Sequence, residues 1–420
     1  MSAKLHRLSS GLRVVCDPLP DFQTFALSVV AGRGARSETP AQSGWAHLLE
    51  HMAFKGAGGR NARELAEAVE AEGGQINAAT GYERTSFQIR ALKGGLPLAI
   101  EILSDLVLRP TLDPEELERE KLVVAQEIAD AADAPDDKVF ELAQAQAFAG
   151  QALGRPILGR TRTVNAARSD SLGAFRALQY APQHLVVSAA GAVDEDELLA
   201  LVDHAFAGPA GPDDASSAPA RFNGGEATLA RRLEQAHTVL LLPGVGARDE
   251  TYFVQRVFAE ALGGGMSSRL FQEAREKLGL AYTIDAYAEG YEDVGVLGVY
   301  AGSAGADAAR TAEICGRQVI ALAEDVQDSE LARSKAQLKA HLFMARESPL
   351  SRAEQAAGQT LLFDRLFTPA QMAQAIDTVS AQDIRSYGRA LLARGVMASA
   401  VLGPKSALKA GDAFRRSLFG

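Results

Sequence analysis

The sequence VVAGRGARSE at residues 29–38 recurs as LLPGVGARDE at residues 241–250. The two segments lie 212 positions apart, and five of their ten residues are identical. Residues 175–191 and 387–403 resemble each other at the same offset. Similarity at one fixed offset indicates that a structural unit was duplicated within the chain. We therefore expect two homologous domains that share one architecture.

Strand and helix patterns are mixed within the first copy. Residues 12–15 and 23–32 are rich in β-forming side chains, and residues 75–80 and 85–90 have the pattern of a hairpin. Helical patterns cover residues 94–108, 113–132, 136–149, 169–180 and 194–206. We expect an α+β fold in which each domain is a mainly antiparallel sheet packed with helices.

Capping signals mark three helix starts. Ser43 is expected to cap the helix that follows it. Asn61 and Glu64 have the spacing of a capping box. Asp113 precedes a proline and two glutamates, which favours an N-cap followed by an acidic first turn.

A stretch rich in glycine, proline, serine and aspartate separates the two copies, at residues 208–226. Such a composition is typical of a linker. We expect a first domain at residues 1–210, a linker at 211–226 and a second domain at 227–420.

Composition and charge exclude several classes of protein. The net charge of −10 argues against nucleic acid as the main partner. Cys16 and Cys315 are the only cysteines, so neither a disulfide framework nor a cysteine-based zinc site is expected. No apolar run approaches 18 residues, and the N-terminus lacks the apolar core of a secretory signal. We expect a cytoplasmic protein that does not enter a membrane.

The segment His47-Leu48-Leu49-Glu50-His51 has the spacing of a metal site. On a helix, positions i and i+4 share a face, so both imidazoles can reach one ion. Glu50 lies beside them and can accept a proton from water. A pair of surface histidines on an amphipathic helix is the simpler alternative. At the offset of 212, however, the two histidines correspond to Ala259 and Gly263, which favours metal chemistry confined to the first copy.

Two histidines and a water leave a zinc site one protein ligand short. Glu120 and Glu127 lie two turns apart on one face of the helix that begins after Asp113. From the spacing alone either carboxylate could be the ligand, and a solvated helix face is the alternative for both.

The sequences HLLEHMAFKG at residues 47–56 and REKLVVAQEI at residues 119–128 resemble the pitrilysin/insulinase family of zinc metallopeptidases. Within it, the chain looks most like the two-domain branch that includes the β subunit of the mitochondrial processing peptidase and its bacterial relatives. The resemblance implies one Zn²⁺ per chain, held by His47, His51 and Glu127. It also implies that Glu120 supports the site and that Glu50 is the general base.

The resemblance implies a substrate groove as well. The segment at residues 75–79 is similar to the family's active-site edge strand, where Asn77 and Ala78 would meet an extended peptide. Phe54 could line the pocket beside the cleaved bond, although a core role is nearly as plausible for it. In the second copy, Arg275 and Tyr282 occupy positions that contact substrate carbonyl groups in the family. For Asn77, an ordinary turn-forming role is an equal alternative.

These observations together predict a zinc-dependent endopeptidase or oligopeptidase that hydrolyses unfolded peptides bound in extended form, with Glu50 activating a zinc-bound water. We expect a homodimer, or a heterodimer with a related two-domain subunit. One alternative is a catalytic subunit that needs a distinct zinc-less partner. Another is a non-catalytic scaffold subunit, although the chain keeps the full set of His47, Glu50, His51 and Glu127.

Overall fold

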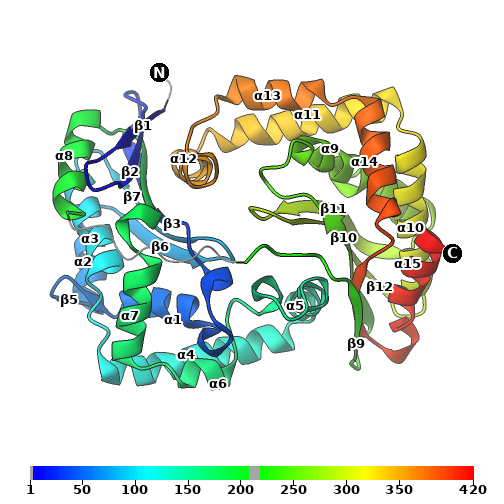
Figure 1. Ribbon diagram of the computed structural model, residues 1–420, viewed down its shortest axis with the longest axis horizontal. Helices are drawn as coiled ribbons and strands as arrows, with labels where there is room; N and C mark the ends of the chain where they lie inside the picture. Colours follow the sequence, from blue (N-terminus) through cyan, green and yellow to red (C-terminus); the bar gives the residue numbers. More distant parts are fainter. Residues whose placement is uncertain (1–2, 208–217) are drawn as a thin grey trace. The chain divides into compact units, whose positions relative to one another are not determined.

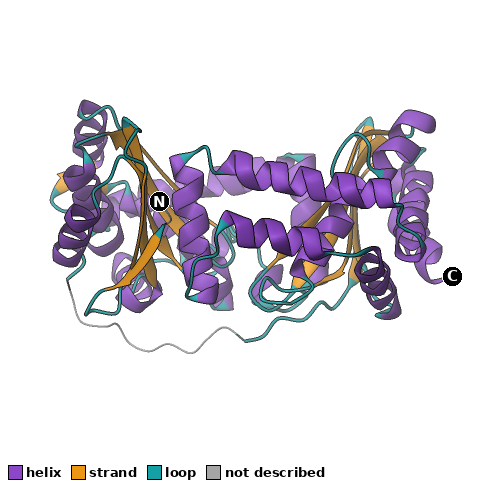
Figure 2. Cartoon of the chain, turned by 90° about the horizontal axis from the view of Figure 1, so that it is seen from above, coloured by secondary structure: helices purple, strands orange, loops and turns teal. Residues whose placement is uncertain are grey.

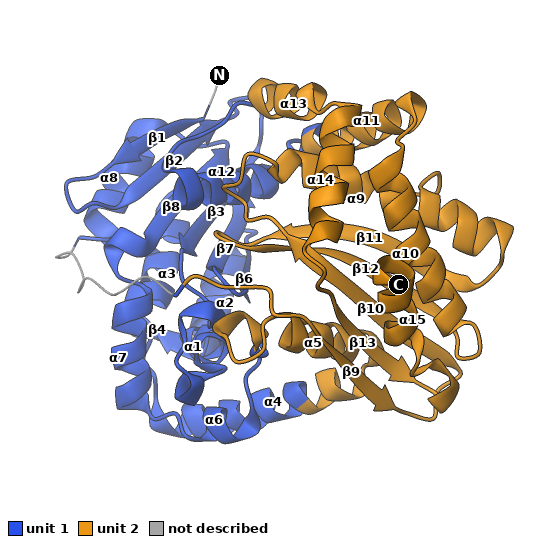
Figure 3. Cartoon of the chain, turned by 45° about the vertical axis from the view of Figure 1, so that its right-hand side comes forward, with its two compact units in different colours: residues 1–128, 155–218, 343–368 blue, residues 129–154, 219–342, 369–420 orange. Residues whose placement is uncertain are grey.

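The computed structural model describes residues 3–207 and 218–420 (Figure 1). The first part of the expected linker, residues 211–217, lies outside the described residues. The chain forms two compact units, each built from three separate segments (Figure 3). Unit 1 comprises residues 1–128, 155–218 and 343–368, and unit 2 comprises residues 129–154, 219–342 and 369–420.

Unit 1 contains a six-stranded sheet with helices packed against it (Figure 2). The strand order is β1 (Lys4–Arg7), β2 (Arg13–Pro18), β8 (Leu185–Gly191), β3 (Thr24–Ala31), β7 (Thr85–Leu92) and β6 (Gln75–Thr80). Only β2 and β8 pair in parallel, whereas the other neighbours in this sheet are antiparallel. The helices are α1 (Trp45–Ala53), α2 (Ala62–Ala71), α3 (Leu96–Leu108), α4 (Pro114–Asp133), α6 (Thr161–Asn165), α7 (Ser169–Gln179), α8 (Glu195–Ala205) and α12 (Pro349–Phe363).

Unit 2 repeats this plan with a five-stranded sheet. The strand order is β11 (Ala281–Gly290), β12 (Gly295–Ala304), β10 (Gln235–Gly244), β13 (Ala398–Gly403) and β9 (Gly225–Ala230). Only β13 and β9 pair in parallel. The helices are α5 (Pro135–Ala147), α9 (Tyr252–Gly263), α10 (Ala308–Glu324), α11 (Asp328–Ala345), α13 (Pro369–Thr378), α14 (Ala381–Ala393) and α15 (Ala410–Phe419).

The predicted α+β fold with mainly antiparallel sheets is confirmed, and so is the hairpin, which is formed by β6 and β7. The capping box of Asn61 and Glu64 is present at the start of α2. Asp113 accepts hydrogen bonds from the backbone N–H groups of Glu115 and Glu116, as an N-cap does. The prediction for Ser43 is wrong, because Gly44 is the N-cap of α1 and makes no side-chain cap.

The compact units do not coincide with the two halves of the sequence, because each unit contains a helix from the other half. Helices α5 and α12 correspond to each other in the repeat. Nevertheless, α5 packs against β13, β10 and β9 in unit 2, whereas α12 packs against β8, β3 and β2 in unit 1. The division at residues 1–210 and 227–420 therefore stays a prediction about the duplication.

Helix α12 is fixed to the unit 1 sheet by polar contacts. The carboxylate of Asp17 is 2% exposed and accepts hydrogen bonds from Arg352 Nε at 2.8 Å and Arg352 Nη2 at 2.9 Å. Ser28 Oγ, on β3, donates to Glu354 Oε1 at 2.7 Å. A buried carboxylate is tolerated only with such partners, so these contacts specify where the helix lies.

Within the residues that the structure describes, no helix combines the length and the apolarity needed to cross a bilayer.

Candidate metal centre

Helix α1 carries the HLLEH segment and is anchored by its apolar face. Leu48, Leu49 and Met52 are fully buried in the core of unit 1. Because a helix turns about 100° per residue, His47 and His51 are left together on the opposite side. Their ring centroids lie 4.5 Å apart. Local sequence pattern and tertiary packing thus agree on where the two imidazoles point.

The first turn of α1 is capped from outside the helix. Gly44 has a left-handed backbone, with φ of +92°, and leads into the helix without a side-chain cap of its own. The carboxyl group of Glu38 takes that place. Its two oxygens accept hydrogen bonds from Gly44 N–H at 3.0 Å and from Ala46 N–H at 2.8 Å. Burial raises the pKa of Glu38 to about 8, opposed by these backbone hydrogen bonds.

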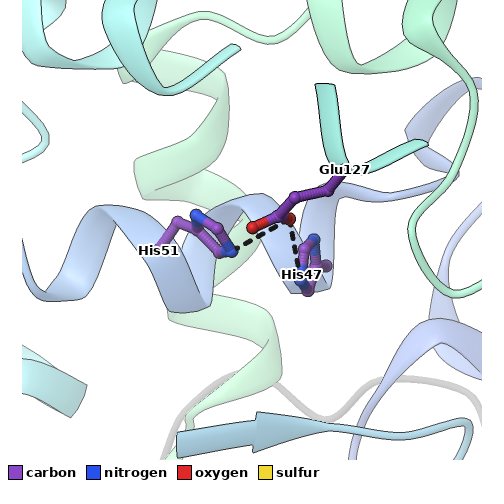
Figure 4. Close-up of side chains that lie close together, drawn as sticks. All are labelled: His47, His51 and Glu127. Atoms are coloured by element: carbon purple, nitrogen blue, oxygen red, sulfur yellow. Dashed lines mark ion pairs between the residues drawn. The ribbon is translucent and has the colours of Figure 1, made fainter. Parts of the chain in front are cut away.

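Helix α4 brings a third ligand candidate to the two histidines. Glu127 Oε2 lies 3.5 Å from His51 Nε2 and 3.8 Å from His47 Nε2 (Figure 4). One ligand atom from each of the three residues lies within 4.8 Å of the other two. Ligand atoms at about 2.0–2.2 Å from a tetrahedral zinc ion are roughly 3.3–3.6 Å apart. The distances of 3.5 Å and 3.8 Å lie within or close to this range, so small side-chain adjustments suffice for the three residues to share one zinc ion.

An unpartnered carboxylate oxygen at this site also fits a cation. Glu127 Oε2 is buried and has no hydrogen-bond partner among the described residues. A buried carboxylate oxygen without a donor is costly unless a cation balances it. Burial and the neighbouring His51 lower the pKa of His47 to about 4, so its imidazole is neutral at pH 7 and has a lone pair for a metal.

Glu120 lies behind His51. Its carboxylate is 3% exposed, accepts a hydrogen bond from His51 Nδ1 at 3.0 Å and forms an ion pair with Lys55 Nζ at 2.6 Å. Because the carboxylate only accepts, a proton of the His51 ring is assigned to Nδ1, and Nε2 is left to face Glu127. This arrangement orients a metal-binding imidazole.

Glu50 shares the site with the three ligand candidates and is held by the neighbouring strand. Thr80 Oγ1, at the end of β6, donates a hydrogen bond to Glu50 Oε2. Burial raises the pKa of Glu50, while the Thr80 hydroxyl and His51 act in the opposite direction. A carboxylate whose pKa is raised by burial is a stronger base than one in water.

The expected edge strand is present. Strand β6 ends the order of the unit 1 sheet, and no other strand of the described chain pairs with its outer edge. Asn77 is exposed, whereas Ala78 is half-buried and packs against the core. Phe54, at the C-cap of α1, packs against Phe87 with ring centroids 6.3 Å apart. Whether these residues contact substrate stays a prediction.

Arg275 and Tyr282 belong to unit 2. Arg275 lies on η5 (Phe271–Lys277), a π-helix, with its guanidinium over the Phe271 ring at 4.6 Å from the centroid. Tyr282, near the start of β11, is 61% exposed. π-Helical turns are frequent at functional sites, and both side chains are accessible. Their contact with substrate stays a prediction.

Three residues that contribute to the site were missed by sequence reasoning. Lys55 lies four residues after His51, so its place on the same side of the chain could have been inferred from helical spacing. Thr80 alternates with Ala78 on the inner face of β6, a period-2 signal that was also available. Glu38 precedes α1 by several residues, and no local pattern links it to the helix.

The second unit has no corresponding centre. Among the described residues, His47, His51 and Glu127 form the only group suited to hold a metal ion. Glu127 corresponds to Lys339, whose Nζ pairs with Asp377 Oδ1 at 2.7 Å. At Gly263, the counterpart of His51, a Cβ atom would lie only 2.4 Å from the backbone nitrogen of Ala286. Strand β11 thus leaves no space for a side chain there.

Comparison with protein-family models gives two matches. Residues 13–161 match the model of the insulinase family, peptidase family M16. Residues 167–338 match the model described as the peptidase M16 inactive domain. The first match contains all the ligand candidates, and the second covers much of the region without them.

Curated relatives align over nearly the whole chain. A Streptomyces coelicolor protein named an uncharacterized zinc protease is 36% identical, with 94% of this chain and 88% of the relative covered. A protein of the same description from Rickettsia bellii is 33% identical, with 95% and 97% covered. One from Bacillus subtilis is 33% identical, with 92% and 95% covered.

Solved structures share the fold at lower identity. A protease from Helicobacter pylori aligns with a TM-score of 0.88 at 21% identity, over 96% of this chain and 99% of that one. A Pseudomonas fluorescens structure described as a peptidase M16 inactive domain gives 0.89 at 17% identity, over 96% and 98%. A chain of complex III from Candida albicans gives 0.86 at 19% identity, over 99% of each chain.

Proposed function

Because the chain belongs to the insulinase family of peptidases, family M16, and is a zinc metallopeptidase, we propose that it hydrolyses unfolded peptides bound in extended form. The observation that carries this proposal is the convergence of His47, His51 and Glu127 beside Glu50. The first three residues supply one ligand atom each, and Glu50 supplies a base next to them.

We propose that His47 Nε2, His51 Nε2 and a Glu127 carboxylate oxygen hold one zinc ion per chain. Two neutral imidazoles and one carboxylate are a common donor set of catalytic zinc sites, which keep a further position open. Partial exposure of all three side chains supports such access. Glu120 keeps the His51 ring in the tautomer that this role requires, and Lys55 balances the charge of Glu120.

Zinc, when bound, would polarise the scissile carbonyl and make water at the site more acidic. In our proposal Glu50 accepts the proton of the attacking water at a carboxylate oxygen and later donates it to the leaving amine nitrogen. Thr80 holds Glu50 Oε2, which leaves Glu50 Oε1 to take the proton. This pair would therefore keep the base in one orientation during the reaction.

We propose that the peptide adds as a strand to the outer edge of β6. A free strand edge presents backbone N–H and C=O groups in the spacing that an extended peptide needs, irrespective of its sequence. Asn77 and Ala78 lie on this strand, and Phe54 lies at the end of the helix that bears Glu50. Thr80 is the last residue of β6, so the edge strand and the general base share one hydrogen bond.

Arg275 and Tyr282 complete the proposal from unit 2. A guanidinium and a phenol can donate hydrogen bonds to substrate carbonyl groups, and both could stabilise negative charge that develops there. We further propose a dimer, either of two identical chains or with a related zinc-less subunit. Mixing Glu50→Gln chains with Arg275→Ala chains should restore some activity if the two residue sets act across protomers.

The test is a peptide-library cleavage assay with the purified chain alone, in the presence and absence of a chelator. We expect chelator-sensitive cleavage by the wild-type chain. The Glu50→Gln variant should retain about one zinc per chain but lose roughly 10²- to 10⁴-fold in kcat. Undiminished turnover of this variant would contradict the general-base role. Cleavage only after addition of a second, related subunit would favour the heterodimeric alternative.

A further inference from the structure

The first turn of α1, the helix that carries His47 and His51, is capped by the carboxyl group of Glu38. We propose that Glu38 is a positioning residue of the metal centre, whose carboxyl group fixes the first turn of α1 and thereby the place of His47. The inference rests on the proposed function, because it assigns Glu38 to the same site. Glu38 does not contact the ligand candidates and acts only through the helix.

The contacts of Glu38 are directed at the backbone next to His47. The first four N–H groups of a helix have no partner within the helix. Glu38 Oε1 accepts from Ala46 N–H at 2.8 Å, and Glu38 Oε2 accepts from Gly44 N–H at 3.0 Å. Ala46 immediately precedes His47 in the chain. Displacement of the Glu38 carboxyl group would therefore move the backbone of Ala46, and with it the position of the adjacent His47 side chain.

Glu38 is itself held in place. Its side chain is 4% exposed, and its own carbonyl oxygen accepts a hydrogen bond from Arg155 Nη2. Its backbone N–H donates to Ala35 O at 3.3 Å, which closes the short helix η1 (Ala35–Ser37). The cap is thus a rigid part of unit 1 rather than a mobile surface side chain.

A close crossing of two chain segments supports the same helix start. A Cβ atom on Gly44 would lie 2.6 Å from Leu158 O, and one on Gly159 would lie 2.3 Å from Ser43 O. Thr163 Oγ1 donates to Ser43 O at 2.6 Å. The backbone just before α1 is therefore held in place by close contacts, and the hydrogen bonds of Glu38 fix the first turn of the helix.

The second unit retains the glutamate without this use. Glu250 corresponds to Glu38 in the repeat and is exposed. Helix α9 begins at Tyr252, and its N-cap, Thr251, makes no side-chain cap bond. The first turn is thus capped by a buried glutamate only in the unit that carries the metal ligand candidates. Glu250 therefore provides a matched control.

The experiment compares Glu38→Ala, Glu38→Asp and Glu38→Gln with Glu250→Ala in the full chain. Zinc affinity is measured by competition with a chromogenic chelator, and kcat and KM are measured on a cleaved peptide. Trp45, the only tryptophan and the first residue of α1, is 8% exposed, so its fluorescence reports the state of this helix start.

We expect Glu38→Ala to lose about 10- to 100-fold in zinc affinity and in kcat, the range typical of residues that orient metal ligands. KM should stay within about twofold, because Glu38 does not lie on the proposed peptide edge. The Trp45 emission should shift to longer wavelength. Glu38→Gln keeps one acceptor oxygen at the same reach and should lose less than Glu38→Asp, which is one methylene shorter.

Wild-type zinc affinity together with unchanged Trp45 emission in Glu38→Ala would overturn the inference, as would an equal loss in Glu250→Ala. If Glu38→Ala does not fold, identical zinc affinities of Glu38→Asp, Glu38→Gln and the wild type would overturn it instead. Failure of the wild type to cleave peptides would count against the proposed function alone, because zinc affinity and Trp45 emission are measured without peptide.

Discussion

Helices α1 and α9 come from the two copies of one duplicated unit, yet only α1 carries metal ligand candidates. His47 and His51 of α1 correspond to Ala259 and Gly263 of α9. Both helices bury an apolar face against the sheet of their unit. The packing that forms the fold is therefore independent of the residues that form the site. One copy could lose or never acquire the metal centre without loss of the architecture.

Helices α4 and α11 also differ at the positions of the ligand candidates, where the charge is reversed at one position. Glu120 and Glu127 of α4 correspond to Ala332 and Lys339 of α11. A lysine at the place of the third ligand repels a cation, and Gly263 removes the space for an imidazole. Charge and volume thus both disfavour a metal at the corresponding place in unit 2. Substitutions at the positions where the two copies differ therefore test which residues hold the metal.

The largest effect is expected from the residue pair that differs in charge. Glu127→Gln removes the anionic ligand, so zinc content should fall from about one per chain to near zero, and peptide cleavage should be lost with it. Lys339→Gln, at the corresponding position of unit 2, should change neither. Metal analysis by mass spectrometry of both purified variants checks this. Retained zinc in Glu127→Gln, combined with loss in Glu120→Gln, would exchange the roles of the two carboxylates.

The duplicated architecture and the helix that carries His47 and His51 could be predicted because each leaves a regular pattern in the sequence. The repeat offset locates corresponding elements, and the i, i+4 spacing places His47 and His51 on one face. The capping box at Asn61 followed from local hydrogen-bonding chemistry and is confirmed.

The features that could not be predicted depend on tertiary contacts between distant segments. Glu38 caps α1 although the nearer Ser43 has a suitable hydroxyl, because a left-handed Gly44 and the crossing with Gly159 determine the path of the chain. Sequence periodicity also does not show that α5 packs in unit 2 and α12 in unit 1. Both helices have similar local patterns, and only the partners on the sheet decide which unit each one joins.

The exchanged helices offer the next test. Arg352 of α12 pairs with the buried Asp17, whereas the corresponding residue of α5 is Phe140, which stacks on Tyr300 with ring centroids 5.4 Å apart. Arg352→Met leaves a buried carboxylate with only the more distant Arg346, at 3.7 Å. The free energy of unfolding should fall by up to roughly 3–5 kcal/mol, because the buried carboxylate loses both hydrogen bonds from Arg352 and keeps only the ion pair with Arg346.

The control for Arg352→Met is the double variant Asp17→Leu, Arg352→Met. It replaces the ion pair between α12 and β2 by an apolar contact, similar to the contact that Phe140 makes in unit 2. It should recover most of the loss, since replacing both partners of a buried pair by apolar groups is often neutral. Urea unfolding of the three proteins measures the difference. A double variant no more stable than Arg352→Met would show that α12 requires the ion pair specifically.

A smaller effect is expected at the contact of α9 with β11. The added methyl of Gly263→Ala would meet the backbone nitrogen of Ala286 at 2.4 Å, so the helix and strand must separate. Overpacking of this kind costs about 1–3 kcal/mol, which exceeds the gain in helix propensity of up to about 1 kcal/mol. Gly265→Ala is the matched control, because nothing lies within 4 Å of a Cβ atom there. Equal urea midpoints for the two variants would contradict the close contact.

A dependence on pH is expected from His47, which corresponds to an alanine in unit 2. The pKa of His47 is lowered to about 4 in the folded, metal-free chain, first by burial and then by His51. In the unfolded chain it is about 6.5. Between these values the unfolded state binds a proton that the folded state does not. The free energy of unfolding should therefore decrease as the pH falls from about 6.5 to about 4, by at most ~1.4 kcal/mol per pH unit from this group.

Unfolding curves in the presence of a chelator, compared with those of His47→Gln, isolate this contribution from the carboxylates that titrate in the same range. Parallel pH dependences for the two proteins would mean that the His47 imidazole takes up its proton equally well in the folded chain, and the burial of this side of α1 would then be less complete than the structure indicates.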